Sequence, residues 1–569
     1  MCNRFSKLSI VVLILLCNNL LGQNLENSFL SPPDSVKPWV FWFWINGNIS
    51  KKGITKDLEA MKDVGINGVI WMEVSGPWWA PQGKIEAGSK EWHDAMQWAI
   101  TEADRLKMEF ALSIDFGYGS GGLHITPDIS MQELVWNSIE IQGGEKLEIE
   151  LEKPVVDKEL EHVWLRPGQE MNPVVSKAID EVDSYKDISV FAVKTAHFKK
   201  SKLIPDNRKD ELIESLKNIP TLHGVKEDPL MAYDGRGWKT HLPPLDFNPD
   251  ISALDSQEII HLNDKIDKNG NLSWKAPNGD WTIIRMGYAS NYKMTRPSPY
   301  RALGLEADRL HPRGIETHYE NRLRPIIENA GEMAGRTLKY VHIDSWEAYG
   351  QNWTLDFAKE FEKRRGYDIS PWMPVLLGHA VKSKEMTERF LWDMRKTVGE
   401  VTLDNYVLRL KELNEKYGIK NSNEPYGRLC VNTFEYAATS DFIIGEFWTE
   451  RKIIDKFPTF QDYWYNSMKG LASVANTYGK TRVGAEAFTG SRGWVDHPYL
   501  IKGMGDEAFS NGINHYVYHL YAHQAYDNMK PGLTHRRWGQ HINRNQTWWK
   551  MSNPYFDSNY YTKMASGFL

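Results

Sequence analysis

The chain has 569 residues, more than one usual domain holds, so its length predicts one large body with an insertion or an appendage. Its charge is nearly balanced, with 68 Lys and Arg against 74 Asp and Glu, and no basic run follows the pattern of a phosphate-binding surface, which argues against a nucleic-acid partner. The 23 Trp, 25 Tyr and 21 Phe offer flat faces that suit sugar rings, although core packing should account for most of them.

Residues 1–22 have the pattern of a secretory signal peptide. Two basic residues precede an apolar run from Leu8 to Leu16, which is too short to span a bilayer comfortably, and cleavage is expected near Gly22. The protein is therefore predicted to be exported, as a periplasmic or secreted protein. A lipoprotein anchored at Cys17 is the alternative, against which Leu16 counts because a small residue is expected there. No other stretch approaches membrane length, and Cys430 would be left without a disulfide partner.

Strands and helices alternate in residues 23–136, which are predicted to form the first part of a barrel. The run "WVFWFWING" is typical of a strand buried on both faces, and residues 68–74 and 109–117 are predicted as the next two strands. Apolar residues recur at helical spacing over residues 54–65 and 91–106. Strands that alternate with helices predict parallel βαβ units.

The pattern changes between residues 137 and 291, where short alternating segments such as "KLEIELEKP" and "ISVFAVKT" predict an inserted β-rich domain after the third strand. The βα alternation resumes with a helix over 311–333 and a strand over 339–344. Further strands are predicted at 418–427, 440–448, 481–490 and 512–523, and helices at 385–417 and 460–478, the second broken near Gly470. Eight strands close a (β/α)8 TIM-type barrel, so residues 292–569 are predicted to form its second part.

Polar residues close the predicted strands, at the end where a parallel barrel has its active site. In strand order they are Asn46, Glu73, Asp115, Asp344 with Glu347, Glu424, Glu446, Glu486, and His515 with His519. A salt bridge or a helix cap explains a single strand-end carboxylate about as often as catalysis does. Seven acidic residues on six strands would raise one another's pKa and cost stability, unless a cationic ligand, a metal or acid–base chemistry relieves that cost.

The acidic residues favour glycoside hydrolysis, in which a carboxylic acid protonates the leaving oxygen and a carboxylate activates water or attacks carbon. The chain has no Walker A, dinucleotide-binding or HExxH motif, and no serine or cysteine has a nucleophile-elbow context; "GYGSGG" (117–122) is interpreted as a flexible loop over the site.

Strands four and seven lie on opposite sides of a barrel mouth, so Glu347 and Glu486 are predicted to face one another, at roughly 6.5 to 9.5 Å in an inverting enzyme. Glu347 is assigned as the general acid because Trp346 and the apolar strand would raise its pKa, and Glu486 as the general base. The alternative is that Glu347 binds a ligand or orients the substrate.

Several segments resemble glycoside hydrolase family 106, the inverting α-L-rhamnosidases. They are "PWVFWFWINGNISKKGITKDLEAMKDVGINGVIWMEV", "HIDSWEAYGQNWT", "FEKRRGYD", "RFLWDMRKTV", "GEFW", "GAEAFTG" and "RNQTWWK". The resemblance implies a calcium-assisted barrel that removes terminal L-rhamnose from plant-type polysaccharides or glycosides. It makes Glu347 the acid, Glu486 the base and Glu446 a further acid that serves the metal or the sugar. Family members usually continue into β-sandwich domains, which the resemblance implies are missing after Leu569.

The remaining strand-end residues are predicted to bind the metal or the sugar. Ca²⁺ takes about six to eight oxygen ligands, and Glu424 and Glu446 are the predicted ones. The predicted substrate-binding residues are Asp344, Trp346, Asn46, Glu73, Asp115, His515 and His519; for the two histidines, satisfied polar groups lining the barrel are the alternative. Two other functions stay open: an exo-glycosidase for another deoxy sugar or a uronic acid, and a non-catalytic glycan-binding barrel inactivated by truncation.

Overall fold

The computed structural model describes residues 27, 29–76, 79–156, 170–203, 251–347, 350–426, 431–449, 458–490, 493–552 and 556. Within them, eight parallel strands close a barrel in the order β1-β16-β15-β14-β13-β12-β3-β2, which confirms the predicted eight-stranded α/β barrel. The strands are β1 (Trp39–Ile45), β2 (Gly68–Val74), β3 (Glu109–Ser113), β12 (Leu338–Ile343), β13 (Lys420–Asn423), β14 (Phe442–Trp448), β15 (Val483–Thr489) and β16 (His515–Ala522). The predicted signal peptide, with Cys17, and also Cys430 lie outside the described residues.

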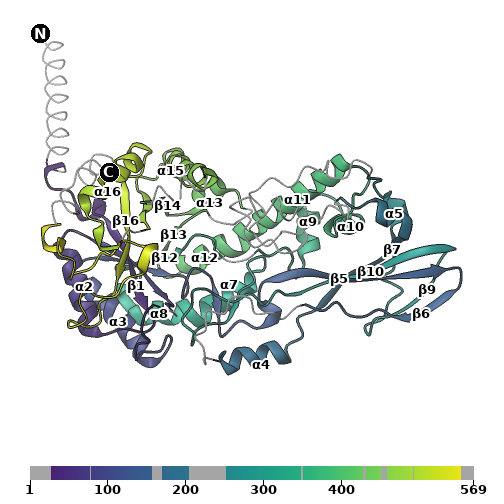
Figure 1. Ribbon diagram of the computed structural model, residues 1–569, viewed down its shortest axis with the longest axis horizontal. Coiled ribbons are helices and arrows are strands. Elements are labelled where there is room, and N and C mark those ends of the chain that lie inside the picture. Colours follow the sequence, from purple (N-terminus) through teal and green to yellow (C-terminus); the bar gives the residue numbers. More distant parts are fainter. Residues whose placement is uncertain are drawn as a thin grey trace, which may run out of the picture.

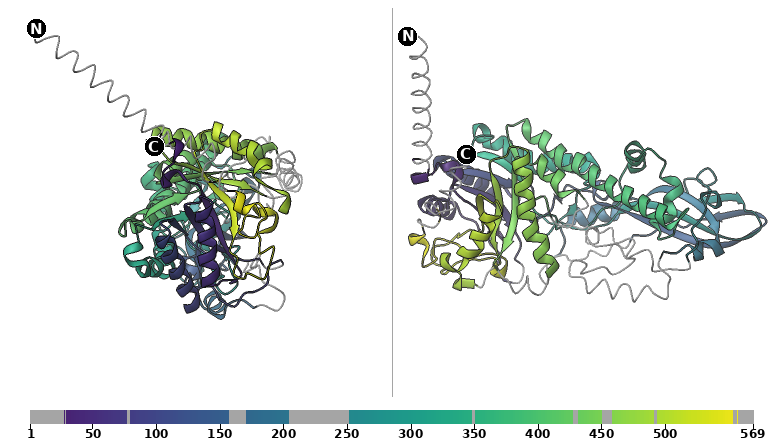
Figure 2. Two further views of the ribbon diagram at one scale, coloured as in Figure 1. Left: turned by 90° about the vertical axis from the view of Figure 1, so that its left-hand side faces the viewer. Right: turned by 90° about the horizontal axis from the view of Figure 1, so that it is seen from above.

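Helices surround this barrel (Figures 1 and 2). They are α2 (Lys51–Asp63), α3 (Lys90–Arg105), α7 (Pro312–His318), η7 (Tyr319–Leu323), α8 (Arg324–Ala330), η10 (Leu403–Leu408), α12 (Arg409–Glu415), α13 (Thr433–Thr439), α15 (Pro458–Thr477) and α16 (Pro498–Ser510). The hydroxyls of Ser50 and Ser89 cap α2 and α3. The predicted break at Gly470 is wrong: α15 is continuous, and a Cβ there would come within 2.8 Å of the Phe434 ring of α13, so glycine serves close helix packing. No described helix has the length and apolarity that a membrane crossing needs.

The aromatic residues of β1 fill two different layers of the core. Phe41 and Phe43 point into the barrel, where they pack with residues of β2, β14 and β16. Trp42 and Trp44 point outward and pack with Trp92 of α3 beneath the helices. Because both faces of the strand are buried, its sequence is a continuous apolar run. These indoles therefore serve the core and are not available to a sugar.

A second lobe is built around an antiparallel sheet that leaves the barrel after β3 and returns before β12 (Figure 1). We call it the intervening sheet; its strands are β5 (Gln132–Gly143), β7 (Lys186–Lys194), β8 (Ile260–His261) and β10 (Gly279–Ser290), in the order β5-β10-β7-β8. Two further pairs are β6 (Lys146–Glu150) with β9 (Asn271–Lys275), and β4 (Gly121–Gly122) with β11 (Leu305–Glu306). Two short helices, α4 (Pro173–Glu181) and α5 (Thr195–Lys200), lie in the same part of the chain.

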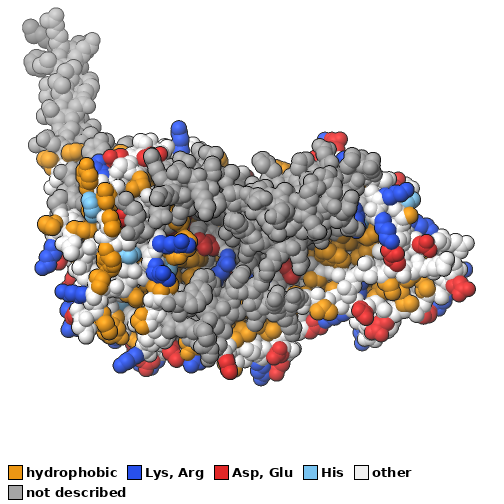
Figure 3. All heavy atoms as spheres, viewed as in Figure 1, with side chains coloured by type: hydrophobic (Ala, Val, Ile, Leu, Met, Phe, Trp, Pro, Cys, Tyr) orange, Lys and Arg blue, Asp and Glu red, His pale blue; other side chains and the backbone are white. Residues whose placement is uncertain are grey.

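Three helices that follow β12 pack on the intervening sheet: α9 (Phe357–Arg365), α10 (Met373–Leu376) and α11 (Lys384–Thr402). Phe357, Phe361 and Phe390 share one apolar cluster with Phe191 and Ile284 of the sheet. These helices lie within residues 292–569, which are predicted to form the second part of the barrel. The apolar spacing of a helix does not show which partner it packs against, so the sequence does not distinguish a barrel helix from a helix that covers the sheet. On the face shown in Figure 3, acidic and basic side chains are interspersed over this lobe.

Candidate active site

Four buried carboxyl groups gather at the carboxyl ends of neighbouring barrel strands. Asp344 directly follows β12, Glu424 directly follows β13, and Glu446 and Glu486 lie opposite one another on β14 and β15. Burial raises the pKa of Glu424, of Glu446 and of Glu486 well above the ordinary value, and the charges of the neighbouring carboxylates raise each of them further. The strand ends thus bring together four of the acidic residues that the sequence singles out.

Glu486 has a distinct set of partners. Its carboxyl group accepts a hydrogen bond from Thr489 Oγ1 at 2.5 Å and is hydrogen-bonded to the carboxyl group of Glu446, and both bonds oppose the rise of its pKa. Two carboxyl groups hydrogen-bond to each other only when one of them carries a proton, so Glu446 and Glu486 share a proton. His519 Nδ1 lies 3.6 Å from Glu486 Oε1, and burial lowers the pKa of His519 well below its ordinary value, so the ring is neutral.

Glu347 lies beyond the end of β12, and its side chain is exposed. The sequence predicts that burial beside Trp346 raises the pKa of Glu347, but an exposed side chain does not have that burial. Its negative charge nevertheless raises the pKa of Glu446, of Glu486 and of Tyr118, which places it at the same mouth as the buried carboxyl groups. The backbone carbonyl of Glu347 accepts a 2.5 Å hydrogen bond from Arg296.

Trp346 lies behind Glu347 and is partly buried. The Arg309 guanidinium carbon lies 4.0 Å from the centre of its ring, and the Tyr406 ring makes an edge contact with it. Trp346 therefore packs into the wall of the mouth.

His342, Asp344 and Glu424 form a group that could hold a metal ion. One ligand atom of each lies within 4.8 Å of the others, and His342 Nε2 and Glu424 Oε1 are buried without a hydrogen-bond partner. The two carboxylates are the oxygen donors that Ca²⁺ prefers, whereas imidazole is more typical of transition metals. Glu446, the other predicted calcium ligand, is not in this group and bonds to Glu486 instead.

Glu73 and Asp115 do not join the carboxyl groups of the mouth, because their partners lie in the helix layer. Glu73 accepts a 2.5 Å hydrogen bond from the indole of Trp92 on α3, and Asp115 lies 3.7 Å from Arg322 of η7. Burial raises the pKa of both carboxyls to about 7, while the positive charge of Arg322 opposes the rise. Both residues form a buried charge cluster with Arg322 behind the barrel wall, which favours a structural role over the predicted contact with substrate.

Asn46 and His515 also have structural surroundings. Both amide atoms of Asn46 bond to the backbone of the loop after β2: its nitrogen donates to Gly76 O and Ala80 O at 3.0 Å, and its oxygen accepts from Gly76 N at 2.7 Å. His515 points into the barrel as His519 does, but one layer deeper, between the rings of Trp39 and Phe442. Of the two histidines, only His519 lies within 4 Å of a carboxylate at the mouth.

The loop "GYGSGG", which is predicted to be flexible, is held by hydrogen bonds and close contacts in the structure. Gly121 donates to Asp115 at 2.8 Å, Ser120 donates to Glu306 at 3.2 Å, and a Cβ at Gly119 would come within 2.1 Å of Glu306. The loop holds Tyr118, whose pKa is raised by burial and by the charges of four carboxylates of the mouth. Sequence reasoning missed Tyr118, although its place just after the third strand is a signal for it.

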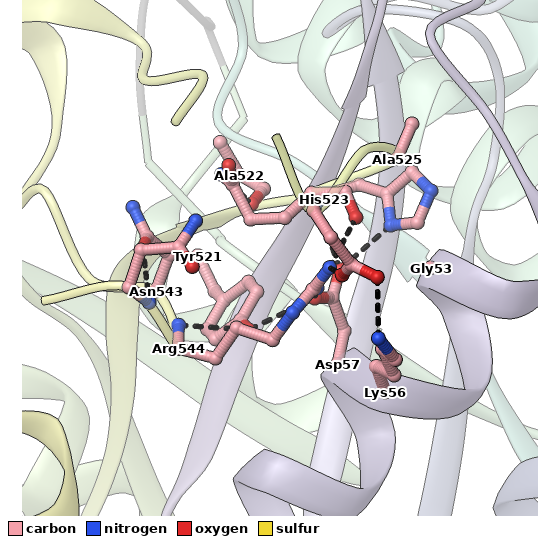
Figure 4. Close-up of polar contacts among 12 residues, drawn as sticks. Gly53, Lys56, Asp57, Tyr521, Ala522, His523, Ala525, Asn543 and Arg544 are labelled. Carbon is pink, nitrogen blue, oxygen red and sulfur yellow. Dashed lines mark hydrogen bonds and ion pairs between the residues drawn. The ribbon is translucent and has the colours of Figure 1, made fainter. Parts of the chain in front are cut away.

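The chain beyond β16 also borders the mouth. His535 Nε2 lies 3.4 Å from the Tyr118 hydroxyl, and Gln540 donates to the backbone carbonyls of Phe488 in β15 and of Gly490 just after it. Buried Asp57 of α2 anchors this segment, because it accepts hydrogen bonds from Tyr521, His523 and Arg544 (Figure 4). Sequence reasoning missed this anchor, since Asp57 lies more than 460 residues along the chain from each of its three partners.

A closed parallel barrel with clustered carboxyl groups at the carboxyl ends of its strands has the architecture of a barrel glycosidase. The chain belongs to glycoside hydrolase family 106: the model of that family, described as alpha-L-rhamnosidase, matches residues 30–565.

A protein of Formosa agariphila named "Putative beta-glucuronidase" is 34% identical over 556 residues, which are 96% of this chain and 43% of that protein. The structure of a rhamnosidase from Novosphingobium sp. PP1Y has the same fold, with a TM-score of 0.75 and 24% identity over 95% of this chain and 60% of that one. The chain thus spans less than two thirds of the length of either relative.

Proposed function

We propose that the protein is an exo-acting α-L-rhamnosidase that hydrolyses terminal L-rhamnose with inversion. The observation that carries this proposal is the convergence of Glu347, Glu446 and Glu486 at one mouth, close enough for the charges of Glu347 and Glu486 to act on the carboxyl of Glu446. Membership of the family described as alpha-L-rhamnosidase supports the choice of sugar. We also propose export by the predicted signal peptide, and that residues 137–291 are an insertion in the barrel.

In this mechanism Glu347 is the general acid, which protonates the leaving oxygen, and Glu486 is the general base, which activates a water on the other face of the sugar. The hydrogen bonds to Glu446 and Thr489 orient the Glu486 carboxyl group and favour its ionised form. Neutral His519 provides a polar group beside that carboxylate. Tyr118 and Arg296 border the site next to Glu347.

We propose that Ca²⁺ assists this site, held by Asp344 and Glu424. The orphaned Glu424 Oε1 and the repulsion between buried carboxylates are the features that a cation would relieve. The bound ion would supply a positive charge that orients vicinal hydroxyls of the sugar. His342 fits less well as a ligand, because imidazole is more typical of transition metals than of Ca²⁺.

The product anomer tests the mechanism. Proton NMR during hydrolysis of an aryl α-L-rhamnoside should show β-L-rhamnose as the first product, whereas α-L-rhamnose would mean retention and would exclude Glu486 as a base toward water. Glu347→Gln and Glu486→Gln should bind the phenyl rhamnoside, whose leaving group needs the acid, in calorimetry without turning it over. A wild type that binds and never turns over would support the non-catalytic binding module.

A panel of aryl glycosides tests the sugar. The relative named for beta-glucuronidase activity favours one second candidate, an exo-glycosidase for a uronic acid, with Arg296 as the cation at the mouth that would face a carboxylate. Turnover of the glucuronide and not of the rhamnoside would establish that candidate and overturn ours. Turnover of another deoxy sugar would keep the mechanism and change the substrate.

A further inference from the structure

The barrel itself does not position Glu347. Glu446 and Glu486 lie within β14 and β15, whose register fixes them, whereas Glu347 lies four residues beyond the end of β12. It belongs to a loop that we call the acid loop, residues 344–354, of which 348 and 349 lie outside the described residues. A loop residue has the position of a catalytic acid only if contacts from elsewhere hold the loop.

Such contacts come from Asp308 and Arg309, both of which are buried. Asp308 accepts hydrogen bonds from Gln351 Nε2 and from Thr354 Oγ1, each at 2.5 Å. The backbone nitrogen of Arg309 donates to Gln351 Oε1 at 3.0 Å, so both ends of the Gln351 amide are bound. These bonds fasten the last part of the acid loop.

Arg309 also holds the part of the loop next to the acid. Its guanidinium lies over the Trp346 ring, one residue before Glu347, and is itself held by a 2.6 Å bond to buried Glu306. Two consecutive residues, Asp308 and Arg309, therefore contact the acid loop on both sides of Glu347.

The intervening sheet completes this support. Leu134 N of β5 donates to the Asn352 side chain at 2.9 Å, Gln132 of β5 forms an antiparallel bridge with Trp353, and Asn291, just after β10, donates to Gly350 O at 3.3 Å. In Figure 1, β5 and β10 run from the second lobe toward α7 and the barrel. The end of the sheet nearest the barrel thus meets the acid loop.

We propose that Asp308 and Arg309 are positioning residues for the general acid, and that the intervening sheet serves to present them and the acid loop to the barrel mouth. The inference rests on the proposed role of Glu347. If it holds, loosening the loop impairs protonation of the leaving group and leaves the attack of water largely intact.

The leaving group separates these effects. A phenol of low pKa departs without protonation, whereas a phenol of high pKa needs the acid. Thr354→Val removes one hydroxyl that binds Asp308. We expect kcat/KM to fall roughly 10- to 100-fold for the phenyl glycoside, and less than about 3-fold for the 2,4-dinitrophenyl glycoside of the same sugar. Thr354→Ser keeps the hydroxyl and should restore activity on the phenyl glycoside.

Thr337→Val is the matched control. Thr337 is equally buried, precedes β12 at the opposite end of the barrel, and donates a 2.5 Å hydrogen bond to Asp104. The same substitution there should lower activity on both glycosides by the same small factor. Gln351→Met, which removes the amide bound by Asp308 and Arg309, should repeat the selective loss of Thr354→Val.

Glu347→Gln distinguishes failure of the inference from failure of the proposed function. If it loses activity equally on both glycosides, Glu347 is not the acid and the proposed function is wrong in that role. If it loses activity on the phenyl glycoside alone, while Thr354→Val and Gln351→Met lose it equally on both, the positioning role is refuted.

Discussion

Replacing Arg322 by Met tests whether Glu73 and Asp115 are structural. The guanidinium carbon lies 3.9 Å from the centre of the Phe116 ring, and a Met side chain would fill much of that apolar space without its charge. Removing one partner from a buried charge cluster typically costs about 3–5 kcal/mol, because the remaining charges lose their compensation. We expect a loss of unfolding free energy of that order.

The loss should depend on pH. The folded-state pKa of Glu73 and of Asp115 is already about 7, above the unfolded values near 4, and loss of Arg322 raises both further. A raised carboxyl pKa gives stability that is present below pH about 4 and is lost as the pH rises through the folded pKa. Arg322→Met should therefore be more destabilised at pH 8 than at pH 6.

Urea unfolding followed by circular dichroism at pH 6 and pH 8 measures this difference. The triple variant Glu73→Gln, Asp115→Asn, Arg322→Met should recover much of the stability, because no unpaired charge remains. A loss below about 1 kcal/mol that is equal at both pH values would refute the reasoning. If Glu73→Gln had normal stability and a raised KM, Glu73 would be a substrate-binding residue and not a structural one.

Three further predictions concern the mouth and its supports. Glu446→Gln should lower kcat by about 100-fold or more with KM little changed, because Glu486 loses the carboxyl group with which it shares a proton; an unchanged kcat in steady-state assays would contradict this. Chelation with EDTA should abolish activity and Ca²⁺ should restore it, with Asp344→Asn needing more Ca²⁺ for half-maximal rate; full activity in EDTA would remove the metal from the mechanism. Asp57→Asn should lower the unfolding free energy by about 3–5 kcal/mol, because Arg544 loses its buried partner, and a urea midpoint equal to the wild type would show that the anchor is dispensable.

The barrel could be predicted because most of its strands are apolar runs closed by a polar residue, and that pattern does not depend on distant partners; β13, with the sequence KNSN, is the exception. The sequence does not show toward which face of β2 the Glu73 side chain points. It points to the same face as Trp71, which packs in the helix layer, and away from the face of Met72, which lies in the barrel interior. Because both faces of β2 are apolar, no sequence pattern shows which of the two is inside.

Residues at the mouth were predictable where the strand itself carries them. Glu446 and Glu486 are brought together by the register of β14 and β15, and parallel strands deliver their ends to one place. Tyr118 and Asp57 lie outside strands, and contacts over long sequence separation place them. Their surroundings follow from the assembled fold and not from any local pattern.

The acid loop follows directly from a barrel strand but is held by contacts from distant parts of the chain. A barrel can fix the base through strand register, but an acid four residues past its strand needs support from outside the barrel. Here the support comes from Asp308, Arg309 and the end of the intervening sheet. On this argument the sheet is a part of the catalytic apparatus, and its removal should cost the enzyme its acid before it costs the barrel its fold.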